Sequence, residues 1–461
     1  MYNAYVTRIK NVRKHPNADR LQLGECFGNT VCVNLDYKDG QIGVYFPTDG
    51  QLSVDFAEKN NLLRKKDDAG NNVGGYMDPD KRNVTAIRLR GEKSDGLFLP
   101  LESLSYFGDI SVLKEGDRID NFNGHEICCK YIPKRNVRHG HPSNGNRTRK
   151  KKVATAPLFA EHADTEQLSY NLGAFKPGDE VEISLKMHGT SQRTAYLPVL
   201  KGYKKTFMDK LLRREGTPVY DWGYVSGTRR VVLDDYDGGY YGSNEFREQH
   251  SKAFENKLMK GETVYYEVVG FTTNGTPIMG DGNNSKVGKE FVKQYGETTT
   301  FSYGCAPSES EYVMSYWDEL ENTQLCEVQT IPQSDIYVYR MTMTNEDGFV
   351  VEYTPDYMRY RCEQMGIKCV EVFERFFIPE NDYGDSPGDF VLHEAERFYA
   401  GPDPIGKTHT REGVVVRILN RPKFCAYKHK NFEFKVLEGI IKDNASAPDM
   451  EEAQEVSEEV A

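Results

Sequence analysis

Three features that are common in secreted and membrane proteins are missing from this sequence of 461 residues. No apolar run reaches the roughly 18 residues that a membrane span needs, and the N-terminus does not have the pattern of a signal peptide. The nine cysteines are an odd number and none has CxxC spacing, so we expect no disulfide framework and a reducing compartment. These absences predict a soluble, cytoplasmic protein that does not bind a membrane.

Positive charge is scarce overall but concentrated in one place. The net charge of −11 argues against a protein that coats nucleic acid nonspecifically. Residues 130–152, however, contain nine Lys and Arg and no Asp or Glu, whereas residues 443–461 contain seven acids and no base. The basic segment is typical either of a phosphate-contacting region or of an ordinary solvated linker, and both interpretations stay open.

The length predicts two or three domains. Residues 1–117 contain short alternating runs separated by turn signals, which favours a small β-barrel. Residues 118–155 are expected to form a basic linker, and residues 156–442 a large domain in which strands alternate with a few helices. Residues 443–461, which are acidic and poor in aromatics, are expected to be a disordered tail.

One stretch of the large domain combines a strand with a reactive side chain. Residues 182–185 alternate like a strand, and the sequence then continues as KMHGTS, from Lys186 to Ser191. A lysine at a strand end suits covalent chemistry, because its amine can attack a phosphoryl group while Gly189 lets a ligand approach the backbone. The KxxG pattern alone is common, and a solvated surface lysine would fit it equally well.

Three further stretches place charged residues on predicted strands. Glu267 lies within the apolar run 264–271, where an acid is costly unless a cation or a hydrogen bond meets it. Glu412 precedes a glycine and a β-branched run at 411–417. Lys428 and Lys430 alternate in a strand, so both project from one face and can reach one phosphate chain. Lys435 is an alternative to them, although the run around it is more typical of an amphipathic helix.

Taken in order, these stretches resemble the motifs of the covalent nucleotidyltransferases, and specifically of ATP-dependent polynucleotide RNA ligases. KMHGTS resembles motif I with Lys186 as the nucleophile, Glu267 motif III, Glu412 motif IV and the Lys428/Lys430 pair motif V. Residues 225–229 (VSGTR) resemble the short motif whose arginine, here Arg229, reaches the ribose side of the nucleotide. Residues 336–341 resemble motif IIIa, which implies that Tyr339 stacks on adenine, with Phe301 as the second choice.

The resemblance implies an α+β fold. The large domain would be an ATP-grasp-like nucleotidyltransferase domain of antiparallel sheets with helices. The segment HPNADRL, residues 15–21, resembles part of OB-fold domains that bind structured RNA, and one branch of RNA ligases carries an N-terminal OB-type β-barrel. We therefore expect residues 1–117 to be an OB-fold domain that binds nucleic acid, with a packing or partner domain as the alternative.

The resemblance also implies a reaction and its participants. Lys186 would attack ATP to give lysyl-AMP, AMP would pass to a 5′-phosphate end, and a 3′-hydroxyl would displace it to form a phosphoric-ester bond. Lys186, Glu412, Lys428 and Lys430 would be catalytic; His188, Gly189, Arg229, Glu267 and Tyr339 would complete the nucleotide site. Glu412 would help to hold Mg²⁺ or Mn²⁺, largely through water. The partner would be RNA, as a nicked duplex or an RNA–DNA hybrid, bound by a monomer that acts in RNA repair.

Two residues of this chain differ from the ligase motifs, and other functions are also compatible with parts of the sequence. RNA ligases often have an acid before the nucleophile and a glycine before the motif III acid, whereas this chain has Leu185 and Tyr266. A DNA ligase or a capping guanylyltransferase is disfavoured, because the expected OB domain precedes Lys186 instead of following motif V. A nucleic-acid-binding protein with an inactive transferase domain is the alternative from another class.

Overall fold

The structure is a computed structural model, and it describes most of the chain. The described residues are 2–66, 70, 73–132, 155–162, 165–212, 214, 216–229, 231–233, 236, 244–307, 310–318, 322–381, 384 and 386–443. Most of the predicted basic segment and the predicted acidic tail lie outside these residues. Among the described helices, none has the length and apolar content that would be needed to cross a membrane.

The chain divides into two compact units. Unit 1 comprises Met1–Arg135, Gly282–Thr298 and Asn431–Ala445, and unit 2 comprises Asn136–Asp281, Thr299–Lys430 and Ser446–Ala461. Residues 282–298 and 431–442 were expected within the large domain, but they pack with the N-terminal residues instead. For the last segment the reason is visible, because Phe434 and Leu437 are fully buried and Lys435 Nζ lies 2.7 Å from Asp95 Oδ2.

Unit 1 is built from small antiparallel sheets. A four-stranded sheet has the order β10 (Leu97–Pro100), β5 (Ile42–Phe46), β1 (Ala4–Arg8) and β11 (Arg118–Ile119). Two three-stranded sheets are formed by β2 (Lys10–Lys14), β3 (Gln22–Cys26) and β4 (Asn29–Val33), and by β14 (Cys128–Lys130), β6 (Gly50–Leu52) and β7 (Asn83–Val84). Pairs are formed by β8 (Ala86–Leu89) with β9 (Glu92–Asp95), and by β12 (Asn121–Phe122) with β13 (His125–Glu126).

The β-rich character expected for the N-terminal residues is therefore confirmed, but no closed barrel is found among the described residues of unit 1. Strands β11–β14 lie in residues 118–130, where a linker was expected, and they contribute Ile119, Phe122 and Cys128 to the core of this unit.

The turn at His15 is packed inside unit 1. Its buried ring accepts the Asn17 N–H at Nδ1 (3.0 Å), so Nε2 carries the proton and donates to the Leu89 carbonyl (3.1 Å).

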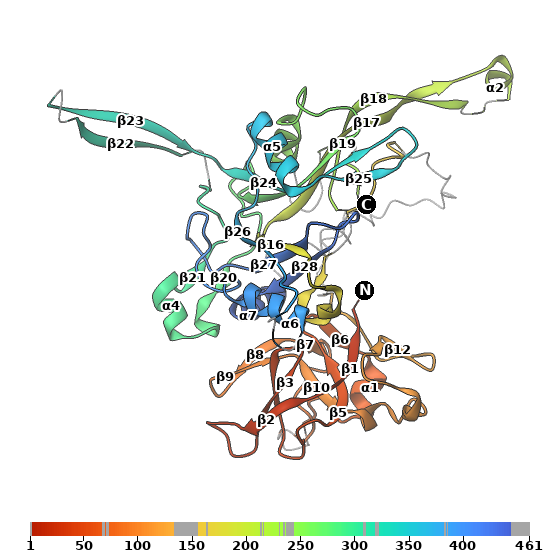
Figure 1. The fold of residues 1–461 in the computed structure, drawn as a ribbon, viewed down its shortest axis with the longest axis vertical. Helices are drawn as coiled ribbons and strands as arrows, with labels where there is room; N and C mark the ends of the chain where they lie inside the picture. The colour runs from red at the N-terminus through yellow and green to blue at the C-terminus, as the bar shows by residue number, and fades with distance from the viewer. Residues whose placement is uncertain are drawn as a thin grey trace. The chain divides into compact units, whose positions relative to one another are not determined.

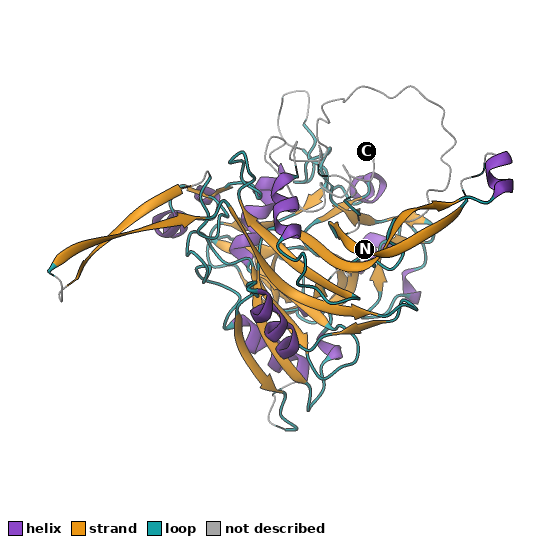
Figure 2. Cartoon of the chain, turned by 90° about the horizontal axis from the view of Figure 1, so that it is seen from above, coloured by secondary structure: helices purple, strands orange, loops and turns teal. Residues whose placement is uncertain are grey.

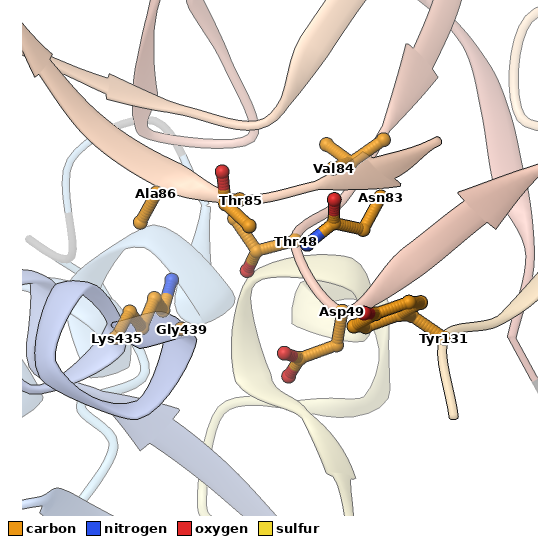
Figure 3. Close-up of a pocket in the computed structure, with 9 residues that line it drawn as sticks. All are labelled: Thr48, Asp49, Asn83, Val84, Thr85, Ala86, Tyr131, Lys435 and Gly439. Atoms are coloured by element: carbon orange, nitrogen blue, oxygen red, sulfur yellow. The ribbon is translucent and has the colours of Figure 1, made fainter. Parts of the chain in front are cut away.

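Unit 1 contains a small cavity beside α7 (Phe432–Asp443), drawn in Figure 3. Its volume is about 10 Å³, which is room for a single water molecule. The lining residues are Thr48, Asp49, Asn83, Val84, Thr85, Ala86, Tyr131, Lys435 and Gly439. Because the Lys435 ammonium is paired with Asp95 within unit 1, it is already neutralised there.

Unit 2 contains two five-stranded sheets, which are labelled in Figure 1. The first has the order β15 (Glu166–Gln167), β28 (Ala426–Lys430), β27 (Gly413–Ile418), β16 (Glu180–Lys186) and β26 (Val372–Phe377). The second has the order β18 (Thr217–Gly227), β17 (Thr190–Lys204), β19 (Glu262–Gly270), β24 (Ser334–Thr344) and β25 (Val350–Glu352). Within these two sheets, every pairing between neighbours is antiparallel except β15 with β28. The predicted α+β class with antiparallel sheets is confirmed.

Helices and short strands complete the described chain. The helices are α1 (Val54–Lys59), α2 (Phe207–Leu211), α3 (Glu245–Lys252), α4 (Lys289–Tyr295), α5 (Pro355–Met365), α6 (Pro387–Glu396) and α7; the remaining strands are β20 (Gly282–Asn283), β21 (Thr298–Thr299), β22 (Ser310–Asp318) and β23 (Thr323–Ile331). Helix α5 shows how local sequence sets its ends. The Thr354 side chain accepts the Tyr357 N–H at the start, and Gly366 ends the helix in the left-handed region at φ 67°.

Candidate active site

Three neighbouring strands of the first sheet bring two lysines and a glutamate together. In the antiparallel register, Lys186 at the end of β16 pairs with Gly413 at the start of β27, and Gly413 pairs with Lys430 at the end of β28. These residues therefore form one row across the sheet edge. Glu412 directly precedes Gly413 and so lies at the same edge.

Glu412 bridges the two lysines. Its Oε1 lies 3.1 Å from Lys186 Nζ and 3.2 Å from Lys430 Nζ, and its side chain is almost fully buried. Burial alone would raise the pKa of this carboxyl group, but the two ammonium groups outweigh burial and hold its pKa well below the usual range. Glu412 is therefore ionised at neutral pH and holds two cations at the end of the strand that carries the predicted nucleophile.

The segment after Lys186 is held by aromatic side chains from residues 301–303. The His188 backbone N–H donates to Tyr303 Oη at 2.6 Å, and the His188 ring meets Phe301 edge-on with centroids 4.8 Å apart. The His188 Nδ1 atom lies 3.6 Å from Glu412 Oε2. Both aromatic rings also contact the buried His409 ring, at 5.1 Å for Phe301 and 4.5 Å for Tyr303. The position of the nucleophile is thus tied to a buried aromatic cluster.

Gly189 brings this segment against the second sheet. A Cβ atom at position 189 would lie 2.5 Å from the Val268 carbonyl oxygen and 2.8 Å from Glu267 Cγ. Real Cβ atoms do not approach so closely, so only glycine allows this contact without a shift of the chain. The glycine therefore lets the segment after Lys186 pack directly against the strand that carries Glu267.

The second sheet aligns Glu267 with a half-buried tyrosine. Ser191 on β17 pairs with Glu267 on β19, which pairs with Tyr337 on β24. Two residues further along β24, Tyr339 Oη lies 3.0 Å from the Ser191 hydroxyl. The His162 ring lies 5.4 Å from the Tyr339 ring, centroid to centroid. The aromatic ring of Tyr339 is thus contacted by groups from two other segments, Ser191 on β17 and His162.

The two other predicted site residues are placed by backbone contacts. Arg229 follows β18, and its carbonyl oxygen accepts the His162 N–H at 3.1 Å, which connects it to the surroundings of Tyr339. Lys428 pairs with Val415 and Gln167, two residues before Lys430 on the same strand. Its side chain therefore leaves the same face of β28 as that of Lys430.

The two residues that depart from the ligase motifs, Leu185 and Tyr266, are buried and contribute to the packing of the protein. Leu185 is buried, and its N–H donates to the Glu371 carbonyl at 2.8 Å. Tyr266 is also buried, with its hydroxyl 2.9 Å from Thr194 Oγ1. Phe301 is only 1% exposed, so it packs beneath His188 and leaves Tyr339 as the more accessible ring.

Sequence reasoning missed three contributors to the site: Ser191, Tyr303 and His409. Ser191 was inside the KMHGTS run and could have been chosen as a strand partner of Glu267. Tyr303 lies 115 residues from His188 in the chain, and no local pattern signals that contact. His409 lies three residues before Glu412, and this closeness in the sequence is the signal that could have placed it at the site.

The groups at this site fit a divalent cation that keeps most of its water ligands better than one that is bound mainly by protein side chains. The Glu412 Oε2 atom is buried and accepts no hydrogen bond in the structure, and a carboxylate oxygen is a ligand that Mg²⁺ and Mn²⁺ prefer. Among the described residues, no group of three or more His, Cys, Asp or Glu side chains could hold a metal ion. Any cation here would take most of its ligands from water and phosphate.

Comparison with solved structures gives the same fold. A Naegleria gruberi RNA ligase mutant solved with ATP and Mn is 14% identical, with 94% of this chain and 97% of that chain covered at a TM-score of 0.51. The ligase with pyrophosphate is 15% identical, with 93% and 96% covered at 0.51. An apo mutant is 16% identical, with 96% and 98% covered at 0.52. No family model matches the sequence, and no curated protein matches it. The chain therefore shares the fold of this RNA ligase, at low sequence identity.

Proposed function

We propose that this protein is an ATP-dependent RNA ligase. The observation that carries the proposal is the Glu412 carboxylate, which lies between Lys186 and Lys430 at the ends of three adjacent strands, on a fold shared with RNA ligases. Lys186 is the nucleophile in this proposal. Its Nζ bonds to the α-phosphorus of ATP while the bond to the pyrophosphate oxygen breaks, and the amine proton leaves to solvent or a basic group.

The remaining charges suit a phosphoryl transfer, which depends chiefly on positioning and charge neutralisation. Lys430 and Lys428 would hold the α-phosphate from one face of β28. Lys186 is held by Glu412 until ATP arrives. The RNA ligase neighbours were solved with ATP, AMP and pyrophosphate, which supports a site for this nucleotide and this leaving group.

The second sheet would recognise the nucleoside. Glu267 and Arg229 would contact the ribose, and Tyr339 would stack on adenine, with its hydroxyl fixed by Ser191. Gly189 would leave room for the nucleotide beside the backbone, and His188 would keep the loop in place through its bond to Tyr303.

Glu412 is the residue that would contribute to a Mg²⁺ or Mn²⁺ site through its Oε2 atom, which lies 3.6 Å from His188 Nδ1 and accepts no hydrogen bond. A bound divalent cation supplies charge neutralisation at the phosphates. Neighbouring structures that contain Mn support this assignment.

After adenylation, AMP would pass from Lys186 to the 5′-phosphate of an RNA end. A 3′-hydroxyl would then displace AMP and seal the strand. Unit 1 would act as an OB-type RNA-binding module, and unit 2 would carry out the nucleotidyl transfer. The substrate would be a nicked duplex or an RNA–DNA hybrid, sealed during RNA repair in the cytoplasm by a monomeric enzyme.

The test is transfer of label from ATP, radiolabelled on its α-phosphate, to the purified protein with Mg²⁺. We expect an acid-stable adduct that pyrophosphate reverses and that Lys186→Ala lacks. Labelled GTP is the matched control, and a GTP-specific adduct would indicate a capping enzyme instead. A folded protein that forms no adduct with either nucleotide would refute the ligase proposal and favour a nucleic-acid-binding protein with an inactive transferase domain.

A further inference from the structure

A two-stranded ribbon extends from the sheet that carries Glu267. Strand β17 pairs with β19 only over Thr190–Ala195, whereas it pairs with β18 as far as Lys204. The part beyond Ala195, residues 196–224 with helix α2 at its tip, is called the arm below; it projects from the sheet in Figures 1 and 2. From Tyr196 to Lys204, the part of β17 that lies in the arm, the strand spans roughly 26 Å at about 3.3 Å per residue.

The base of the arm is fastened while its tip is exposed. Near the base, the Tyr196 and Tyr224 rings stack with centroids 4.7 Å apart, and Lys260 Nζ lies 5.2 Å from the Trp222 ring. A ribbon of two strands is marginally stable alone, so these contacts help to hold its direction.

The tip exposes large apolar side chains to water, which is unfavourable unless a partner covers them. Phe207 is 78% exposed and Leu211 is 65% exposed. Other large apolar residues of the arm are also exposed, namely Tyr203, Met208, Leu212 and Val219. Scattered single apolar residues are normal on a surface, but a group of them on one protruding element marks a binding site.

The charge around these side chains is positive, in contrast to the protein as a whole. Residues 201–215 contain six Lys and Arg and two acids, whereas the chain carries a net charge of −11. Among the described side chains, Lys201, Lys204, Lys205 and Arg214 are exposed. One of the acids, Asp209, is occupied locally, because its carboxylate accepts hydrogen bonds from the Thr206 N–H and hydroxyl.

Basic residues interleaved with exposed aromatic and aliphatic ones fit a nucleic acid: its phosphates meet the cations, and the rings can stack on bases wherever the strand is unpaired. A membrane fits less well, because α2 has only five residues and a helix that lies in a lipid surface is much longer. We propose that the arm is a docking surface for the RNA that flanks the ends being joined. This inference rests on the proposed function, and it names the part of the substrate that the arm contacts.

The length of the arm adds a geometric consequence. A ribbon of roughly 26 Å corresponds to about eight nucleotides at ~3.4 Å each. A nicked duplex with short flanks therefore cannot reach the tip, whereas one with longer flanks can. Binding should strengthen with flank length until the tip is reached and should then level off.

The first test shortens the arm. Replacing residues 201–219 by Asn-Gly joins Leu200 to Tyr220, which are register partners, through a two-residue hairpin turn. We expect the shortened protein to form the ATP adduct on Lys186 at the normal rate, because no predicted site residue is removed. Its affinity for a 5′-phosphorylated nicked RNA duplex with 20-base-pair flanks (a length of about two and a half arm spans) should fall at least tenfold, and its dependence on flank length should disappear.

The second test separates charge from shape. The triple variant Lys201→Ser, Lys204→Ser and Lys205→Ser should weaken RNA binding and lower the slope of log affinity against log salt by about 3, at roughly 0.9 per phosphate contact of a duplex. The matched control changes the same lysines to arginine, which keeps the charge, and should bind as the unchanged protein does. The pair Phe207→Ser and Leu211→Ser should weaken binding without changing the salt slope.

The outcomes distinguish this inference from the proposed function. If the unchanged protein forms no ATP adduct, the proposed function fails, whatever the arm does. If adduct formation is normal and the shortened protein binds every duplex as tightly as the unchanged protein, the inference is overturned. It is also overturned if the arm variants bind RNA normally but lose sedimentation with phosphatidylserine vesicles, or change from dimer to monomer in analytical ultracentrifugation, because the arm would then dock on a membrane or on a second copy.

Discussion

Gly189→Ala is the substitution whose effect follows most directly from the coordinates. The added methyl group would lie 2.5 Å from the Val268 carbonyl oxygen, about 0.8 Å closer than the ~3.3 Å at which carbon and oxygen normally meet. The obstacle is backbone, which no side-chain rotation can remove. The loop that carries His188 must therefore move away from β19 by nearly an ångström.

That displacement sets the expected magnitude. A misplacement of about 1 Å at a reacting group costs on the order of 100-fold in rate, while overpacking of this kind costs about 1–3 kcal/mol of stability. We therefore expect Gly189→Ala to fold, to unfold at a temperature a few degrees lower, and to form the ATP adduct on Lys186 roughly 100-fold more slowly.

The assay is single-turnover labelling by α-labelled ATP, with thermal unfolding followed by circular dichroism on the same preparation. Gly173→Ala is the matched control, because a Cβ atom there would meet nothing within 4 Å. It should leave both measurements unchanged. Adduct formation at the normal rate in Gly189→Ala, with an unchanged unfolding temperature, would show that the contact with Val268 and Glu267 does not position the nucleophile.

Three further predictions concern the groups around the site. Tyr303→Phe removes the acceptor of the His188 N–H and should slow adduct formation about tenfold while costing about 1–3 kcal/mol of stability; an unchanged rate would rule out positioning by this hydroxyl. Glu412 has a lowered pKa in the folded state, so its stabilisation is complete above about pH 4.5 and is lost as the pH falls below that value. The stability advantage of the unchanged protein over Glu412→Gln, about 3 kcal/mol at pH 7, should therefore shrink in acid-range urea titrations, and a constant difference would contradict the ion pairs. Burial raises the pKa of Asp403 to about 7, so this acid favours folding below about pH 4 and loses that contribution as the pH rises to 7. Asp403→Asn, which can keep the bond from the Ile405 N–H, should be more stable than the unchanged protein by up to about 4 kcal/mol at pH 8 and no more stable at pH 4; equal pH profiles would refute this.

The strands of the site could be predicted because each carries its signal locally. The runs before Lys186, around Glu267, after Glu412 and up to Lys430 alternate or are β-branched, and all are strands in the structure. Their order in the chain indicated which residues belong together. The register that joins Lys186, Gly413 and Lys430 is a matter of pairing between distant segments, and only the structure supplies it.

What could not be predicted depends on contacts across long stretches of chain. The Tyr303 hydroxyl meets the His188 backbone because two sheets face each other, and a tyrosine in a loop gives no sign of this. Nothing in the sequence separates residues 282–298 and α7 from the large domain. The amphipathic pattern of α7 indicates that one face of the helix is buried, but it does not indicate which domain buries that face. The roles of all the predicted site residues stay predictions.

The composition of unit 1 has a consequence for how the chain folds during synthesis. Its segment Met1–Arg135 precedes most of unit 2 in the chain, whereas α7 follows residue 430 of unit 2. Until α7 emerges, Asp95 lacks the Lys435 ammonium and the surfaces that cover Phe434 and Leu437 stay open to solvent. Unit 1 is thus completed only after residues 136–430, which include most of unit 2, have been synthesised. During that time a nascent chain would hold an unfinished unit 1, and α7 would be the segment that completes its core.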